Sequence, residues 1–152
     1  DVLLFLHADT QLPEQTGRII ASAFADPAVV GGRFDVQFDS ASVWSRIISA
    51  FMNRRSRLTG ISTGDQALFV RRQVFEQLGG FTEIPLMEDI DFSRRLKRAG
   101  QIAALRDTVT TSFRRWEAQG PMRTILFMWA LRFLYWTGVS PVRLSLWYNA
   151  VR

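Results

Sequence analysis

The chain begins with an unbroken apolar stretch, residues 2–6, which ends on the polar sequence His7-Ala8-Asp9-Thr10. Five consecutive apolar residues are typical of a strand that is covered on both faces, as strands of parallel sheets are. Strand and helix patterns then alternate along the chain. The strand patterns cover residues 29–38, 67–70, 101–105 and 109–113, and the helical patterns follow Pro13 and cover residues 42–55, 72–78 and 88–99. This alternation predicts an α/β protein with a mostly parallel sheet.

The composition fits one folded domain with an affinity for anions. The chain has 152 residues and no cysteine, which excludes disulfides, thiolate metal sites and a cysteine nucleophile. Its formal net charge is +5, and Lys97 is the only lysine, so nearly all of the positive charge comes from arginine. Arginine matches phosphate and carboxylate groups. A phosphorylated ligand, an anionic membrane surface and nucleic acid therefore stay open, and a GC-rich genome would give the same composition without any such role.

His7 and Asp9 follow the apolar strand at its carboxyl end, where open α/β sheets bind their ligands. Alternate residues of an extended chain point to the same side, so the two side chains are expected to face one way. A carboxylate at such a position suits a divalent cation that bridges phosphate oxygens. The alternative is structural, since Asp9 or Thr10 could cap the helix that follows Pro13.

In the helical pattern that begins with Glu88, Asp89 aligns with Phe92 and Leu96 on the apolar face. An unpaired carboxylate on that face is costly, so Asp89 is a candidate general base; it could also simply complement the helix dipole. Asp91 and Arg95 are four residues apart and fit a surface ion pair. In the earlier helical pattern of residues 42–55, the apolar side chains expected to point inward are Trp44, Ile47, Ile48 and Phe51.

Two further motifs carry polar groups beside strands. The first is a tight turn before a strand, with the residues Gly64, Asp65 and Gln66; such turns are also common without any function. The second follows a strand and consists of Arg114, Arg115 and Trp116. Two guanidinium groups beside an indole suit a diphosphate and a sugar or lipid, and the structural alternative is an arginine stacked on a tryptophan at the surface.

Taken together and in this order, the motifs resemble those of the family 2 glycosyltransferases. The resemblance is strongest to a bacterial branch with FLHADT, TGDQ, PLMEDI and RRW at these relative positions. It extends over essentially the whole chain, and the combination is specific although no single motif is.

The resemblance implies the GT-A fold of nucleotide-diphospho-sugar transferases, a Rossmann-like mixed sheet flanked by helices. Residues 1–120 would form the C-terminal part of the catalytic domain. The sequence starts at Asp1 inside a core-strand pattern, without a signal peptide. We therefore expect a fragment whose nucleoside-binding N-terminal strands are missing, and which is inactive or unstable alone. The implied reaction moves a sugar from a nucleotide-diphosphate donor to an acceptor hydroxyl, with inversion and the help of Mn²⁺ or Mg²⁺.

The metal-binding Asp-x-Asp of the family matches His7-Ala8-Asp9. By resemblance, Asp9 would bind the divalent cation, and His7 would bind the same cation or contact the donor. The family's Glu-Asp motif matches Glu88 and Asp89, which would be the catalytic residues, with Asp89 as the base that deprotonates the acceptor.

The remaining motifs imply substrate contacts. Arg115 and Trp116 match the end of the family's Gln-x-x-Arg-Trp motif, and with Arg114 they would contact the donor. Ser112 stands at the glutamine position, which argues against a processive polymer synthase. The residues expected beside the donor sugar or the acceptor are Gly64, Asp65 and Gln66.

Residues 121–152 form an aromatic-rich tail that predicts amphipathic helix. Arg132 interrupts its apolar run, which is therefore too short to span a membrane. The tail would pack on the domain or lie on a membrane surface, where Arg123, Arg132 and Arg143 would suit anionic lipid. We expect a cytoplasmic protein, with peripheral contact at the inner face of the cell membrane and a lipid-linked acceptor left open.

Two other functions stay open. A haloacid-dehalogenase-like phosphatase shares a strand-end acidic motif, but its nucleophilic aspartate would be His7 here. The second is a non-catalytic basic module that binds membrane surfaces or nucleic acid. The basic cluster of Arg54, Arg55 and Arg57 lacks a platform for stacking bases, so we do not expect a nucleic-acid partner.

Overall fold

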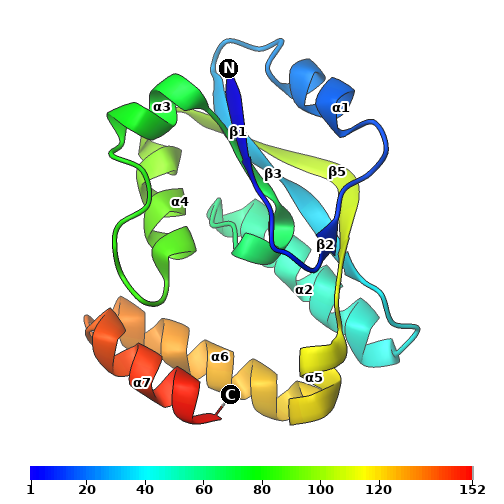
Figure 1. The fold of residues 1–152 in the computed structure, drawn as a ribbon, viewed down its shortest axis with the longest axis vertical. Helices are drawn as coiled ribbons and strands as arrows, with labels where there is room; N and C mark the ends of the chain where they lie inside the picture. Colours follow the sequence, from blue (N-terminus) through cyan, green and yellow to red (C-terminus); the bar gives the residue numbers. More distant parts are fainter. Residues whose placement is uncertain (152) are drawn as a thin grey trace.

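In the computed structural model, which describes residues 1–151, five strands form one mixed, strongly curled sheet flanked by helices (Figure 1). The strands are β1 (Val2–Phe5), β2 (Thr10–Gln11), β3 (Val29–Phe38), β4 (Leu68–Arg71) and β5 (Gln101–Thr111), in the order β1-β4-β3-β5-β2. Only β3 and β5 are parallel, and the other neighbours are antiparallel. The α/β class is confirmed, whereas the expected mostly parallel sheet is wrong.

β1 differs from the expectation in its place in the sheet. It is an edge strand that pairs antiparallel with β4. Leu4 packs against one hydrophobic cluster, and Leu3 and Phe5 pack against another. Both faces of the strand are therefore covered, which explains its unbroken apolar sequence. Cover on both faces does not require parallel neighbours, and this is why the sequence misled on orientation.

The helices are α1 (Thr16–Ala23), α2 (Val43–Thr59), α3 (Arg72–Gln77), α4 (Glu88–Ala99), α5 (Arg114–Gln119), α6 (Pro121–Trp136) and α7 (Pro141–Val151), with a short 3₁₀ helix η1 (Gly64–Gln66). Ser42 caps α2 by accepting a 3.2 Å hydrogen bond from the amide of Trp44. Gly60 ends the same helix in a left-handed conformation. Helix α4 has the bounds that its sequence predicts.

Two layers of core cover the two faces of the sheet. Alternation along β4 divides its side chains: Phe69 packs in a cluster with Ile48 of α2, and Val70 packs in a cluster with Phe92 and Leu96 of α4. Figure 1 shows α3 and α4 at the left of the sheet and α2 crossing below β1 and β3. The carboxyl end of β1 therefore lies close to α4 and η1.

Residues 101–111 form one strand where the sequence predicts two. Arg33 pairs with Ala104, but Asp35 pairs with Thr108, so β5 carries extra residues opposite β3. Arg106 lies exposed in this irregular stretch. A local bulge, rather than a chain break, explains the interruption of the strand pattern.

Helix α2 presents a different face to the sheet from the one expected. Ile48 is buried as predicted, but Trp44, Ile47 and Phe51 are exposed. The reason is Asn53, whose side chain accepts from the amide of Val36 at 2.9 Å and donates to its carbonyl at 3.0 Å. This pairing holds Asn53 against β3 beside the buried Ile48 and leaves the side of α2 that carries Trp44, Ile47 and Phe51 outside.

The tail is helical, as expected, and α6 and α7 lie at the bottom of Figure 1. Leu131 and Leu144 form a third cluster with Met87 and Ile90 of the α4 region. Other apolar side chains of both helices are exposed, so α6 is not divided into one apolar and one polar face as an amphipathic helix would be. Among residues 1–151, no helix combines the length and apolar character that crossing a membrane requires.

Candidate functional site

Three segments that carry predicted motifs meet beside Asp89. His7 follows β1, Asp65 lies in η1, and Asp89 lies in the first turn of α4. The Nδ1 atom of His7 is 3.2 Å from a carboxylate oxygen of Asp65. The amide of Gly64 donates a 3.0 Å hydrogen bond to Oδ2 of Asp89. The short η1 loop therefore connects the strand end to the helix start, and the fold brings together groups that are far apart in sequence.

Asp89 is a largely buried carboxylate held by backbone amides. Besides the bond from Gly64, its Oδ1 atom accepts a 2.7 Å hydrogen bond from the amide of Ile90. Burial raises the pKa of Asp89 above its ordinary 3.8, and the charge of Glu88 adds to that rise, while the two amide hydrogen bonds lower it. Asp89 makes no ion pair within residues 1–151. A fixed carboxylate with a raised pKa is suited to accept a proton.

The start of α4 is fixed by apolar packing on both sides of Asp89. Met87 and Ile90 are 4% and 7% exposed and belong to one cluster with α6 and α7. Met87 has a φ of 71°, a left-handed conformation that is costly for a side chain of this size. This turn sets the direction in which α4 begins and so fixes the carboxylate of Asp89.

His7 is oriented by η1. A Cβ atom at Gly64 would come within 2.1 Å of Nε2 of His7, so this close approach requires glycine. The hydrogen bond to Asp65 is the largest cause of a pKa of His7 above the ordinary 6.5, and burial acts in the opposite direction. The imidazole therefore keeps its positive charge to higher pH than a free histidine would.

Asp9 fits a divalent cation only as a single ligand. Its side chain is exposed and makes no hydrogen bond or ion pair within residues 1–151. His7 does not fit as a second ligand, because its Nδ1 atom faces Asp65 and its Nε2 atom lies against Gly64. The described part of the chain has no group of three or more His, Asp or Glu side chains that could hold a metal ion. Bound substrate or water would have to supply the other ligands.

Two arginines that the sequence did not assign to this site act on it electrostatically. Arg55 lies on α2 and Arg132 on α6. Burial and the positive charge of Arg132 lower the pKa of Arg55 to about 10, and the charges of Asp89 and Asp65 oppose this. Burial also lowers the pKa of Arg132, again opposed by Asp89 and Asp65. The sequence held one signal, since Arg132 interrupts an apolar run, but that signal favoured lipid contact.

Gln66, which the sequence analysis predicts to contact substrate, has structural partners within the fold. It is fully buried, at 0% exposure. Its Nε2 atom donates a 3.0 Å hydrogen bond to Ser56, and its Oε1 atom accepts from the amide of Thr63 at 3.3 Å. Gln66 therefore ties η1 to α2 and holds the loop that carries Gly64 and Asp65.

Arg115 and Trp116 also have partners within the fold. Arg115 donates a short hydrogen bond to the hydroxyl of Tyr148, and its guanidinium lies 4.7 Å from the centre of that ring. Trp116 stacks near Phe113 at a centroid distance of 6.4 Å. Arg114 is exposed and bonds Ser112. These contacts join α5 to the residues that follow β5 and to α7, and within residues 1–151 none of the three residues hydrogen-bonds to the Asp89 cluster.

The acidic residues around Asp89 have separate environments. Glu88 is exposed, and it acts on Asp89 through its charge. Asp91 and Arg95 form the predicted ion pair, with an oxygen–nitrogen distance of 2.9 Å. Asp91 also accepts a 2.7 Å hydrogen bond from Thr82. Asp89 is thus the acidic side chain of this helix start that is largely buried and makes no ion pair within residues 1–151.

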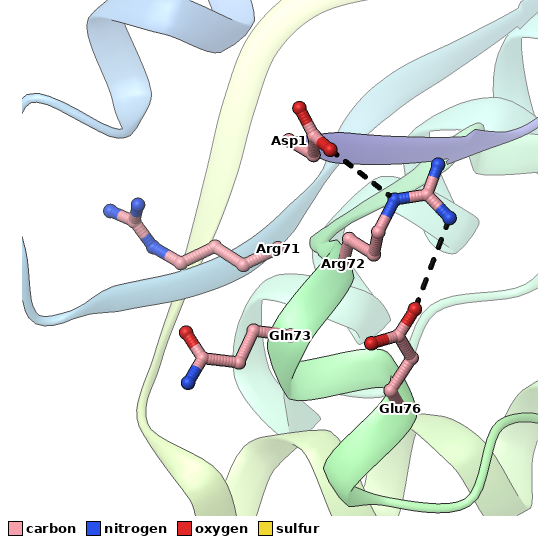
Figure 2. A pocket seen from close by; sticks show the side chains of 5 residues that line it. All are labelled: Asp1, Arg71, Arg72, Gln73 and Glu76. Carbon is pink, nitrogen blue, oxygen red and sulfur yellow. Dashed lines mark ion pairs between the residues drawn. The ribbon is translucent and has the colours of Figure 1, made fainter.

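A hollow of about 300 Å³ lies elsewhere, where β1 and α3 begin (Figure 2). Its lining residues are Asp1, Arg71, Arg72, Gln73 and Glu76. Figure 2 shows Arg72 between Asp1 and Glu76, at 3.7 Å and 3.9 Å. These are long, exposed ion pairs, and none of the residues predicted for the site lines this hollow.

Comparison of the chain with protein-family models, with curated proteins and with solved structures gave no match.

Proposed function

We propose that this protein is a glycosyltransferase with the GT-A fold, in which Asp89 is the catalytic base. The observation that carries the proposal is the environment of Asp89. It is a largely buried, unpaired carboxylate with a raised pKa, fixed by the amide of Gly64 beside the His7–Asp65 pair. Three of the four motifs that carry the family resemblance contribute to this one cluster, and the mixed sheet with flanking helices is consistent with the fold.

In the proposed reaction, the acceptor hydroxyl lies at Asp89 and attacks the anomeric carbon of the donor sugar. The new bond joins the acceptor oxygen to that carbon, and the bond from the carbon to the diphosphate oxygen breaks. The electron pair leaves with the nucleoside diphosphate, and the hydroxyl proton passes to Asp89. His7, whose pKa is raised by its hydrogen bond to Asp65, favours the developing negative charge when it is protonated. A divalent cation bound at Asp9 would neutralise phosphate charge.

A peripheral membrane location is also part of the proposal. We call the exposed apolar side chains of the last two helices the tail surface; its residues are Met122, Leu126, Trp129, Phe133 and Trp136 on α6 and Val142, Leu146 and Trp147 on α7. Arg123 and Arg143 are exposed on the same helices, and the net charge is +5. An apolar surface flanked by cations suits the interface of an anionic bilayer. The same surface would serve the alternative, a non-catalytic basic module.

A donor screen tests the proposal. The full-length protein would be offered a panel of nucleotide sugars with and without Mn²⁺, and release of nucleoside diphosphate would be measured. The proposal predicts turnover with at least one donor. A protein that neither binds nor turns over any donor would overturn the transferase function and favour the non-catalytic module.

A further inference from the structure

Arg55 and Arg132 are partly buried cations without a protein anion. Neither guanidinium makes an ion pair or a hydrogen bond within residues 1–151, and three of their nitrogens are buried without a partner: Nε and Nη2 of Arg55 and Nε of Arg132. By comparison, Arg33 is 1% exposed but pairs with Asp35. Burying an unpaired charge is costly. Two unpaired positive charges that repel one another indicate a binding site for an anion.

The charges of this pair interact with that of Asp89, the base of the proposed reaction. The charges of Asp89 and Asp65 act on both arginines, and the nearest acidic groups are therefore those of the candidate site. Asp89 uses its two oxygens to accept backbone amides and is not neutralised by either arginine. An anion bound by Arg55 and Arg132 would thus place its charge near the group that deprotonates the acceptor.

An aromatic pair continues the same surface outward. Phe51 is four residues before Arg55 on α2, and Trp129 is three residues before Arg132 on α6, so each ring lies on the arginine's side of its helix. The two rings are in contact at a centroid distance of 6.3 Å, although they are 62% and 56% exposed. A cationic pair and an exposed apolar pair therefore adjoin where α2 meets α6.

We propose that Arg55 and Arg132 bind the anionic group of the acceptor, a phosphate ester that carries a long apolar chain, and that Phe51 and Trp129 contact this chain. The attacking hydroxyl of the acceptor then lies between its phosphate and Asp89. The acceptor role rests on the proposed transferase function, whereas the binding site rests only on the unpaired charges and the aromatic pair.

Phosphate could also reach this pair from the donor, whose diphosphate has the same chemistry. The two sources differ in their apolar part. An acceptor lipid uses Phe51 and Trp129, and a nucleoside diphosphate does not. Octyl phosphate, inorganic phosphate, octyl glucoside and uridine diphosphate therefore separate the sources when they are compared as ligands.

The test is calorimetric titration of the full-length protein with these four probes. We expect octyl phosphate to bind about tenfold more tightly than inorganic phosphate, and octyl glucoside not to compete with it. Arg55→Gln and Arg132→Gln should each weaken octyl phosphate about tenfold or more. The controls Arg54→Gln on α2 and Arg98→Gln on α4, both exposed arginines, should not. Phe51→Ala and Trp129→Ala should weaken octyl phosphate but leave inorganic phosphate unchanged.

Several results would overturn the inference. One is equal affinity for octyl phosphate in the arginine variants and their controls. A second is equal affinity for octyl phosphate and inorganic phosphate, which would show that the apolar chain does not contribute to binding. A third is competition: uridine diphosphate would displace octyl phosphate, and its own binding would be lost in Arg55→Gln. This result would assign the arginine pair to the donor. If a glutamine variant does not fold, Arg→Lys replaces it and should still weaken binding, because an ammonium lacks the fork of the guanidinium.

This test does not depend on turnover. If the protein turns over no donor but binds octyl phosphate through the arginines, the proposed transferase function is overturned and the proposed phosphate site is retained. A protein that transfers sugar but shows no arginine-dependent phosphate binding would lose this inference alone.

Discussion

At the scale of the residue, the environment of Asp89 disfavours its charged form. Its pKa is raised above the ordinary 3.8 because burial disfavours the charged form. A raised pKa stabilises the fold only while the group is protonated, and this contribution is lost as the pH rises through the raised value. At neutral pH the charge of Asp89 therefore costs stability.

We predict that Asp89→Asn raises the free energy of unfolding at pH 7, because it removes that buried charge. The gain should shrink as the pH falls through the raised pKa of Asp89 toward the ordinary 3.8, because the native carboxyl is then protonated as well. Urea unfolding of both proteins at pH 7 and at low pH measures this. A variant that is less stable than the native protein at pH 7 would contradict the account of this carboxylate.

His7 allows a second measurement, because it is the only histidine in the sequence. Its pKa lies above 6.5 chiefly because of the hydrogen bond to Asp65. Asp65→Asn should lower the pKa of His7, as followed by NMR of its ring protons. The stabilising effect of the pair is present below pH 6.5 and is lost as the pH rises through the raised pKa. An unchanged pKa of His7 in this variant would show that Asp65 is not its partner.

The sequence allowed part of this site to be predicted. His7, Asp65 and Asp89 lie in motifs whose spacing placed them at a strand end, a turn and a helix start, and the fold brings them together. Arg55 was missed because its importance depends on where α2 meets α6, which no local pattern encodes. The burial of Gln66 was not predicted, because a polar residue in a loop gives no sign in sequence that its amide will be buried.

At the scale of the element, β3 and α2 are joined by a charged network. Asp35 lies between Arg33 and Arg57, with distances of 2.5 Å and 2.6 Å, and Arg33 is 1% exposed. Removal of one partner from a buried ion pair leaves a charge without compensation. This network therefore fixes the position of α2, and with it Arg55.

We predict that Asp35→Ala destabilises the protein by about 3–5 kcal/mol in urea unfolding, since it leaves Arg33 buried and unpaired. The control is Asp107→Ala, an exposed carboxylate on β5. Its effect should stay within about 0.5 kcal/mol. Equal stability of the two variants would show that the network does not fix α2.

The elements themselves were predicted more reliably than their orientation. The bounds of α4 follow from the spacing of its apolar residues and from Gly100, which ends the helix, and both are local features. The antiparallel pairing of β1 and the exposed apolar side of α2 depend on distant partners. The side chain of Asn53, which bonds Val36, turns α2 in a way that hydrophobic spacing cannot predict.

At the scale of the whole molecule, α6 and α7 pack on the domain and expose the tail surface. We predict that the protein sediments with vesicles that contain anionic phospholipid more than with neutral ones, because the apolar surface and the net charge of +5 act together. Trp136→Ala and Trp147→Ala should reduce sedimentation. Val2→Ala should not, since Val2 is an exposed apolar residue on β1, at the other end of the molecule (Figure 1).

Sedimentation that does not depend on anionic lipid or on either tryptophan variant would contradict the predicted membrane contact. The transferase proposal would survive that outcome, because its site lies among β1, η1 and α4. The alternative of a non-catalytic membrane module would not.

The most direct test of the central claim is the rate of sugar transfer by the full-length protein, with the donor that gives the highest turnover. Asp89→Asn should lower kcat by about 10²- to 10⁴-fold while donor binding persists, because the variant loses the base and keeps its shape. Glu83→Gln, an exposed acidic residue in the loop before α4, should retain the native rate. Native turnover in Asp89→Asn would contradict the role of Asp89 as the base.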